Sequence, residues 1–332
     1  MTPLTQTDDA IVGRIEAAAE RIQRVQKATS AVIFGQEQVI ERTLVTILSG
    51  GHALLIGVPG LAKTLLVETL GKILGLDAKR IQFTPDLMPS DIIGAEVLED
   101  STAGRRSFRF VKGPIFAQLL MADEINRASP KTQSALLQAM QEHHVTVAGQ
   151  RHDVPMPFYV LATQNPLEQE GTYPLPEAQL DRFLLQVDVG YPDLSAERRM
   201  LFATTGNDER RVEQILTAPE LMAIQRLVRQ LPVPDKVVEA ILKLARSARP
   251  GTGVGGDTDR LIAWGPGPRA SQALMLAVRA KALIDGRLAP SVDDVVALAE
   301  PVLKHRMALT FAARAEGATP TAVINRLAAA LE

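Results

Sequence analysis

The stretch from residue 53 to residue 70 constrains the fold of this chain more than any other. An apolar run, Ala53-Leu54-Leu55-Ile56, leads into the loop Gly57-Val58-Pro59-Gly60-Leu61-Ala62-Lys63-Thr64, and a helical pattern continues from Leu65. A strand that turns through glycines into a helix directs successive backbone N–H groups and the positive end of the helix at the turn, which suits a phosphate. The pattern therefore predicts a P-loop within an α/β fold.

Two side chains of this loop have predicted roles in binding ATP and Mg²⁺. Lys63 is placed to reach the β- and γ-phosphates, and the Thr64 hydroxyl to bind Mg²⁺. We expect the other nucleotide contacts to come from Gly57 through Leu65. Ala62 replaces the second usual glycine, so we expect the backbone there to avoid positive φ. The alternative is a glycine-rich turn without a ligand, but the strand before the loop and the helix after it favour the nucleotide.

Four further apolar runs alternate with helical stretches, and they are typical of buried strands: residues 80–83, 119–122, 158–162 and 184–187. With the run before the P-loop they make five strands with helices between them. This order predicts a parallel sheet covered on both faces by helices.

The pattern changes at both ends of this region. Residues 1–50 have helical spacing, and past residue 193 the chain is rich in Ala, Leu and Arg with no strand signal. We therefore expect an N-terminal helical segment (1–50), an α/β core (51–193) and an all-helical domain (194–332). A chain of 332 residues fits about two domains.

The composition narrows the chemistry and the compartment. The chain has no Cys, which excludes disulfides, Cys-type zinc sites, iron–sulfur clusters and thiol nucleophiles. The N-terminus has no signal-peptide pattern, and no apolar run approaches the ~18 residues that span a membrane. We therefore expect a cytoplasmic protein without a membrane span.

The apolar run 119–122 ends in two carboxylates, Asp123 and Glu124. Mg²⁺ on a P-loop nucleotide needs an acid at the end of a neighbouring strand, and Asp123 is predicted to fill that place. Glu124 is then predicted to be the general base that activates the attacking water. A solvated acidic turn is the alternative reading, and the P-loop upstream makes it the weaker one.

Three polar residues further along the chain are candidates for contacts with the γ-phosphate. Asn165 follows the run 158–162, and an amide there could orient the water or sense the nucleotide. Arg182, after a short predicted helix, could form a structural ion pair or reach the γ-phosphate of a neighbouring subunit. Arg269 lies near the start of a predicted helix, where the helix dipole disfavours a cation, which points to an external anion.

As a set, five segments of the chain closely resemble the MoxR family of AAA+ ATPases: 57–64, 120–128, 138–142, 162–166 and 173–183. The likeness covers nearly the whole chain, including Arg269 and residues 303–306, and Ala62 is common in that family. The resemblance implies a five-stranded αβα core followed by a helical lid, with ATP between them. It also implies a ring of identical subunits, usually a hexamer.

The resemblance assigns roles to individual residues. Asn165 corresponds to the first sensor, Arg182 to an arginine finger that acts on the neighbouring subunit, and Arg269 to the second sensor. Ile33 falls where related proteins line the adenine pocket. Arg127 is placed, more loosely, toward the neighbouring subunit.

Two inserts are implied as well. Residues 144–154 alternate around Ala-Gly-Gln, which predicts a hairpin, and they resemble the pre-sensor hairpin of the family. Residues 93–110 resemble its helix-2 insert, with 101–104 at the tip. Members of the family are chaperone-like and commonly act with von Willebrand A-domain proteins to mature or activate enzyme complexes, often by helping metal or cofactor insertion.

These observations favour an ATP-driven machine that remodels a protein complex, and three alternatives remain. A nucleic-acid motor shares the hairpin inserts, but aromatic residues are only 4% of the chain and the net charge is −2, which is a poor match to strand binding. The others are an ATPase subunit of a magnesium-chelatase-type enzyme and a non-catalytic P-loop scaffold. The sequence does not name a client.

Overall fold

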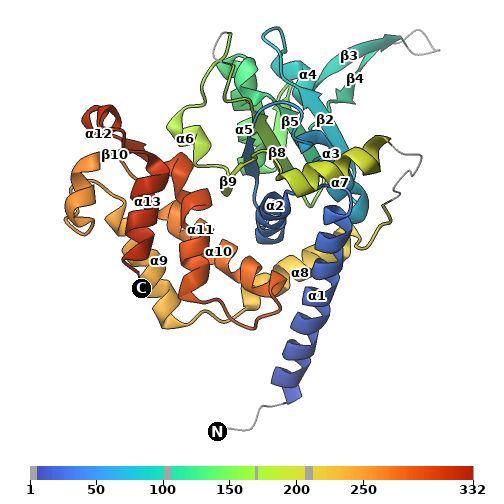
Figure 1. Ribbon diagram of the computed structural model, residues 1–332. Helices are drawn as coiled ribbons and strands as arrows, with labels where there is room; N and C mark the ends of the chain where they lie inside the picture. The colour runs from blue at the N-terminus through green and yellow to red at the C-terminus, as the bar shows by residue number, and fades with distance from the viewer. Residues whose placement is uncertain (1–5, 101–105, 169–170, 206–211, 332) are drawn as a thin grey trace.

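Residues 53–188 contain a five-stranded parallel sheet (Figure 1), with the strand order β2-β5-β8-β1-β9. Its strands are β1 (Ala53–Ile56), β2 (Ala78–Gln82), β5 (Leu119–Asp123), β8 (Tyr159–Gln164) and β9 (Leu185–Asp188). The computed structural model describes residues 6–100, 106–168, 171–205 and 212–331. The five predicted strands and their parallel pairing are confirmed, with small shifts at the strand ends.

The three central strands, β5, β8 and β1, are buried on both faces because they carry apolar residues at successive positions, whereas the edge strand β2 is mostly exposed. Leu55, Met121 and Leu161 point into one hydrophobic cluster, whereas Leu54 and Leu120 point into another. This alternation follows from the two-residue period of a strand. The sheet therefore separates two hydrophobic layers, each of which needs its own cover of helices.

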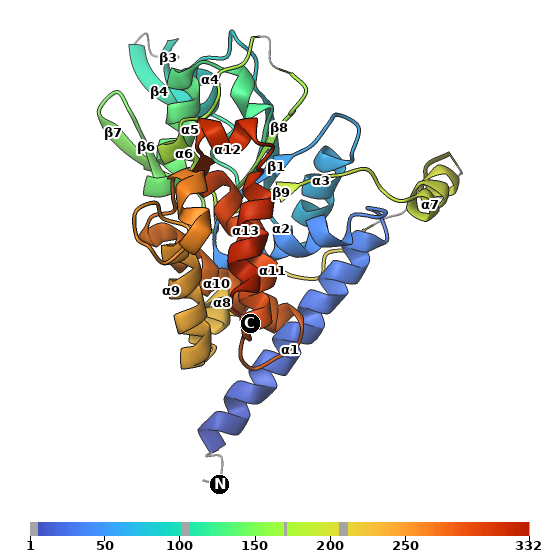
Figure 2. The ribbon, with the colours of Figure 1, turned by 60° about the vertical axis from the view of Figure 1, so that its left-hand side comes forward.

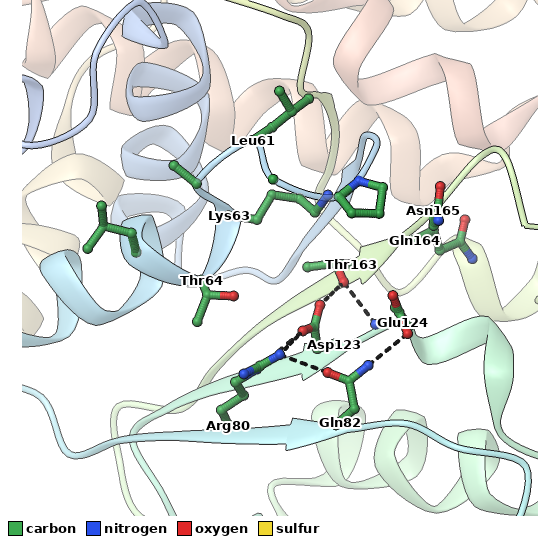
Figure 3. A pocket seen from close by; sticks show the side chains of 14 residues that line it. Leu61, Lys63, Thr64, Arg80, Gln82, Asp123, Glu124, Thr163, Gln164 and Asn165 are labelled. Atoms are coloured by element: carbon green, nitrogen blue, oxygen red, sulfur yellow. Dashed lines mark hydrogen bonds and ion pairs between the residues drawn. The ribbon is translucent and has the colours of Figure 1, made fainter. Parts of the chain in front are cut away.

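The first layer is covered by three helices that precede or follow the P-loop: α1 (Gln6–Ser30), α2 (Glu37–Ser49) and α3 (Lys63–Ile73). The second layer is covered by short and medium helices: α4 (Pro89–Ile93), η1 (Ile125–Arg127) and α5 (Pro130–Glu142), with α6 (Glu177–Leu180) nearby. The carboxyl ends of β1, β5 and β8 meet at one edge, where polar side chains gather (Figure 3).

Two antiparallel hairpins extend from this second layer (Figure 2): β3 (Gly94–Asp100) with β4 (Arg106–Lys112), and β6 (His144–Val147) with β7 (Gln150–Asp153). They contact each other, and the rings of Phe110 and His152 stack at 4.0 Å between centroids. The hairpin predicted at 144–154 is confirmed. The expected tip of the other insert, 101–104, lies outside the described residues.

The C-terminal part is mostly helical: α7 (Leu194–Thr205), α8 (Ala218–Gln230), α9 (Asp235–Ser247), η2 (Gly256–Leu261), α10 (Pro268–Ile284), α11 (Val292–Leu303), η3 (Lys304–Arg306), α12 (Phe311–Ala315) and α13 (Pro320–Ala329). The prediction of helices alone was wrong at one place. Strands β10 (Ile262–Trp264) and β11 (Ala308–Leu309) pair there in an antiparallel manner. Each is too short for an alternating pattern to show in the sequence.

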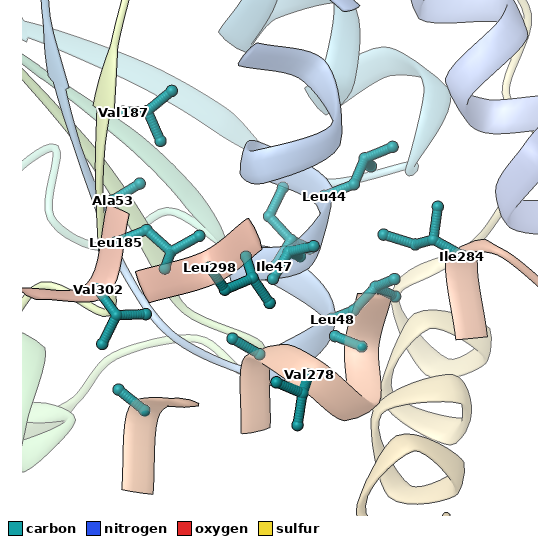
Figure 4. Packing of buried hydrophobic residues seen from close by; sticks show 14 of the residues in the cluster. Leu44, Ile47, Leu48, Ala53, Leu185, Val187, Val278, Ile284, Leu298 and Val302 are labelled. Carbon is teal, nitrogen blue, oxygen red and sulfur yellow. The ribbon is translucent and has the colours of Figure 1, made fainter. Parts of the chain in front are cut away.

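The C-terminal helices share a hydrophobic core with the sheet (Figure 4). Val278 of α10 and Leu298 of α11 pack against α2 and β9, around Leu48 and Leu185. Helix α7 lies apart from the other C-terminal helices (Figure 2). Its Arg199 stands over the ring of Phe34, in the segment between α1 and α2. The sheet ends at Asp188, and the division at residue 193 stays a prediction.

In the described part of the chain, none of the helices combines the length and the apolar character that a membrane crossing requires.

Candidate nucleotide-binding site

A pocket of about 440 Å³ opens where the carboxyl ends of β1, β5 and β8 meet (Figure 3). Ligands of open α/β sheets bind at this edge, because the loops after the strands and the helix N-termini converge there. The pocket is lined by residues 59–65 of the P-loop and by side chains of β2, β5 and β8, namely Arg80, Gln82, Asp123, Glu124, Thr163, Gln164 and Asn165.

The P-loop adopts the shape that phosphate binding needs, at the cost of backbone strain. Ala62 is the N-cap of α3 with φ +58°, so the expectation that its backbone avoids positive φ was wrong. Only glycine takes this conformation easily, and an alanine there costs about 1–3 kcal/mol. The strain indicates that the turn is held by its surroundings.

Lys63 is held inside the loop. Its ammonium group donates hydrogen bonds to the carbonyl oxygens of Gly57 at 2.6 Å and Val58 at 2.8 Å. Burial lowers the pKa of Lys63, while the nearby carboxylates of Asp123 and Glu124 act in the opposite direction. The lysine is therefore a fixed cation at the entrance of helix α3, where phosphates would arrive.

Asp123 is the buried carboxylate of the pocket, with a side chain that is 13% exposed. Its Oδ1 accepts a hydrogen bond from the Thr163 hydroxyl at 2.5 Å, and its Oδ2 accepts two from Arg80, at 2.5 Å and 3.2 Å. Thr163 also accepts a hydrogen bond from the backbone N–H of Glu124, at 2.8 Å. One threonine thus links both acids to strand β8.

Glu124 is held at the mouth of the pocket by two donors. Its Oε2 accepts hydrogen bonds from Gln82 at 2.7 Å and from Arg127 at 3.0 Å. Its backbone has φ +56°, which is strained for a non-glycine residue. The predicted general base therefore stands beside, and not inside, the hydrophobic layer, where a water molecule can reach it.

The residues present suit an Mg²⁺ ion that arrives with a nucleotide. Thr64 supplies a hydroxyl and Asp123 a carboxylate to one pocket, both oxygen donors of the kind that Mg²⁺ prefers. A cation already stands at Asp123, since the Arg80 guanidinium contacts its Oδ2. Among the described residues, no group of three or more His, Asp or Glu side chains could hold a metal ion by itself.

Most of the predicted nucleotide-binding residues line this pocket: Pro59 through Leu65, Asp123, Glu124 and Asn165. Gly57 and Val58 contribute by their carbonyl contacts with Lys63. Ile33 lies elsewhere: its side chain is buried in the first hydrophobic layer and does not line the pocket.

Arg182 and Arg269 lie together in a second hollow, of about 310 Å³, between the sheet and the C-terminal helices. Asp181 in this hollow accepts from Arg306 at 2.8 Å and stands 3.6 Å from Arg269. Residues of the C-terminal domain do not line the P-loop pocket in the described part of the chain. The position of ATP between core and lid, which the family resemblance implied, stays a prediction.

Three polar residues of the pocket were missed in the sequence: Arg80, Gln82 and Thr163. Arg80 and Gln82 are two residues apart on β2, so they share one face of the strand. Polar residues at this spacing beside a buried isoleucine, Ile81, were the available signal. Their partners on β5 could not be known before the strand order was.

Comparison with known proteins identifies the family of this chain. The sequence profile described as "ATPase family associated with various cellular activities (AAA)" matches residues 52–185, and that of the AAA lid domain matches residues 257–327. Chaperone MoxR1 of Mycobacterium tuberculosis is 42% identical over 96% of this chain and 85% of its own length. Protein MoxR of Paracoccus denitrificans is 32% identical over 87% of this chain and 89% of its own.

The fold also has a solved counterpart. The crystal structure of a putative ATPase from Cytophaga hutchinsonii superposes with a TM-score of 0.87 and 37% sequence identity, over 95% of this chain and 96% of the other. The P-loop and the acidic pair lie within the residues matched by the AAA profile, and the AAA lid profile matches part of the C-terminal helical domain. This chain belongs to the MoxR family of AAA+ ATPases.

Proposed function

We propose that this protein binds ATP with Mg²⁺ and hydrolyses it by attack of a water molecule on the γ-phosphate. One observation carries the proposal: a single pocket joins the P-loop, the acidic pair and Asn165 at the carboxyl edge of the sheet. Thr64 and Asp123 would hold Mg²⁺, which neutralises charge on the phosphates. Lys63 would bind the β- and γ-phosphates.

Glu124 would accept a proton from the attacking water, and Asn165 would orient that water. Both roles follow from position: Glu124 lies at the mouth of the pocket, and Asn165 follows the adjacent strand β8. Asn165 is nearly buried, at 8% exposure, and its Oδ1 accepts from the backbone N–H of Leu167 at 3.1 Å. Its amide is thus held in one orientation, which suits a sensor.

We further propose that the subunits assemble into a ring, with six members, in which Arg182 and Arg269 complete the neighbouring site. The support is their shared hollow, which lies apart from the P-loop of the same chain. That hollow is lined by three arginines, Arg182, Arg269 and Arg306, and by one carboxylate, Asp181. The excess of positive charge suits the γ-phosphate of another subunit.

ATP turnover would drive the remodelling or activation of a protein complex, together with a von Willebrand A-domain partner and a client enzyme. The support is the likeness to a relative named as a chaperone. The two hairpins, which lie side by side and stack Phe110 on His152, would face the partner or the ring pore.

A nucleic-acid motor finds less support in the hairpins. Arg109 on β4 pairs with Glu99 at 2.7 Å, and Arg151 on β7 pairs with Asp153 at 2.8 Å. These cations are offset by carboxylates of their own hairpins, whereas a strand-binding surface needs uncompensated ones.

Substitution Glu124→Gln tests the hydrolytic site. It keeps the size and the hydrogen-bonding capacity of the side chain but removes the base, so we expect ATP turnover to fall by about 10²-fold or more while nucleotide binding remains. Glu168→Gln is the matched control, because Glu168 stands on the other side of Arg127, at 3.9 Å. Turnover near that of the wild type in Glu124→Gln would contradict the assignment.

The partner is tested with the same variant. Glu124→Gln protein held with ATP should capture a von Willebrand A-domain protein and an associated enzyme complex from its native lysate. Recovery dominated by nuclease-sensitive nucleic acid would favour the motor instead. Ring size is measured by light scattering or mass photometry in the presence of ATP.

A further inference from the structure

Arg80 lines the P-loop pocket and contacts Asp123, but it has no role in the hydrolysis proposed above. It lies on β2, the edge strand of the sheet, and β2 pairs with β5 so that Gln82 stands opposite Asp123. The long side chain of Arg80 extends along β2 toward the same strand end and reaches Asp123 with two donors, Nη2 at 2.5 Å and Nε at 3.2 Å. Its Nη2 also donates to Gln82 at 2.8 Å.

The two oxygens of Asp123 are both in use. Oδ1 accepts from Thr163 in a buried contact, and Oδ2 accepts from Arg80 in a partly buried one. Asp123 is nearly buried, and a buried carboxylate without a counter-charge is costly. Arg80 supplies that charge from a side chain that is 50% exposed, so it can move away without unfolding anything around it.

The charges of the pocket balance in this arrangement. Among the described residues that line it, Lys63 and Arg80 are positive and Asp123 and Glu124 are negative. An Mg²⁺ ion that uses Asp123, directly or through a bound water, competes with Arg80 for Oδ2, whose contact is the less buried of the two. A divalent cation and a guanidinium also repel each other at such distances.

We propose that Arg80 is the counter-ion of Asp123 in the nucleotide-free site and that Mg²⁺, arriving with the nucleotide, displaces it. The proposal rests on the proposed function, since it concerns the same metal. It makes Arg80 a positioning residue that sets how much Mg²⁺ the site requires: the ion pair must be broken before Asp123 can serve the metal.

Nucleotide binding tests this without any turnover. The full-length protein is titrated with Mg²⁺ at fixed fluorescent ADP, and the half-saturating Mg²⁺ concentration is compared between variants. Arg80→Ala should lower that concentration by about fivefold, the order expected for an ion pair with one half-exposed partner. Direct Mn²⁺ binding in the presence of ADP, followed by electron paramagnetic resonance, should shift in the same direction.

Two variants separate displacement from a general charge effect. Lys79→Ala removes a cation from the opposite face of the same strand and should leave the half-saturating Mg²⁺ concentration within about twofold of the wild type. Arg80→Lys keeps the charge but loses the two-donor grip, so it should fall between wild type and Arg80→Ala. It also serves as the test if Arg80→Ala does not fold.

The outcomes are distinct. The displacement would be overturned if the half-saturating Mg²⁺ concentration of Arg80→Ala and Arg80→Lys equalled or exceeded that of the wild type. The ATPase proposal would not be affected by that result. If Lys79→Ala lowered the half-saturating Mg²⁺ concentration as much as Arg80→Ala, the effect would be one of surface charge, and the displacement would be overturned as well. Wild-type protein that shows no Mg²⁺-dependent nucleotide binding would overturn both the inference and the proposed function.

Discussion

Arg306 in the C-terminal domain forms an ion pair with Asp181, the residue directly before the predicted arginine finger Arg182. Arg306 Nε donates to the Asp181 carboxylate at 2.8 Å, and its other nitrogens donate to backbone carbonyls of residues 181, 183, 184 and 302. The guanidinium is 2% exposed. The lid therefore fixes the backbone on both sides of Arg182.

Replacing Arg306 by alanine should destabilise the protein strongly. The change leaves several buried carbonyls and much of the Asp181 charge without a donor, so we expect the free energy of unfolding to fall by about 3 kcal/mol or more. Urea unfolding measures it. Arg151→Ala, which breaks an exposed pair with Asp153, should stay within about 1 kcal/mol of the wild type. Equal effects in the two variants would contradict the role assigned to Arg306.

Mixing of variants tests whether Arg182 and Arg269 act on a neighbouring subunit. Arg182→Ala and Lys63→Ala should each hydrolyse little ATP alone, because one lacks the finger and the other the phosphate-binding lysine. In an equal mixture, about one quarter of the sites would combine Lys63 of one subunit with Arg182 of its neighbour. ATP turnover should return to about that fraction of the wild-type rate. Arg269→Ala mixed with Lys63→Ala should behave alike. A mixture as inactive as its components would place the arginines in their own subunit's site.

His52 should make stability depend on pH. It is buried between strands, where its Nδ1 accepts from the Val160 N–H at 2.9 Å and its Nε2 faces the Met140 carbonyl at 3.2 Å. Desolvation, helped by the charge of His143 and opposed by the Met140 carbonyl, lowers the pKa of His52 from 6.5 to about 4. Between these pH values His52 binds a proton in the unfolded chain but not in the folded one. The free energy of unfolding therefore falls as pH falls from about 6.5 toward 4.

The loss from His52 alone should reach about 3 kcal/mol at the acid end of this window. His52→Gln offers one donor and one acceptor without a titrating group, so its unfolding free energy should vary less between pH 6.5 and 4 than that of the wild type. Both proteins retain His305, whose pKa burial also lowers, and the difference between the two curves isolates His52. Parallel curves would refute the prediction.

Ala62→Gly should stabilise the P-loop. Ala62 has φ +58°, which costs about 1–3 kcal/mol for alanine, whereas glycine adds about 0.4–1 kcal/mol of unfolded-chain entropy. The net gain should be about 1 kcal/mol, read as a higher urea midpoint. Ala17→Gly, at an exposed site within α1, should have the opposite sign, because glycine weakens a helix. A destabilised Ala62→Gly would show that the strain is not present in solution.

Local sequence patterns were enough to predict most of the helices and strands and those site residues whose role depends on their neighbours along the chain. The P-loop was predicted from glycines between an apolar run and a helical pattern, and the five strands from short apolar runs. The hairpin at 144–154 was predicted from the alternation around Ala-Gly-Gln. Asp123, Glu124 and Asn165 followed from the same logic, since parallel strands bring their carboxyl ends to one edge of the sheet. Each of these predictions depends on residues that are close together in the sequence.

The contacts between residues far apart in the chain could not be predicted from such patterns and became known from the folded arrangement. Arg80 forms an ion pair with Asp123 because β2 lies beside β5 in the sheet. Arg182 and Arg269 line one hollow because the C-terminal helices pack onto α2 and β9. The short pair β10 and β11 joins residues too far apart in the chain to leave a pattern. Strand order and helix packing are set by the burial of whole surfaces, which no short stretch of sequence encodes, so the partners of long charged side chains emerge only when the chain has folded.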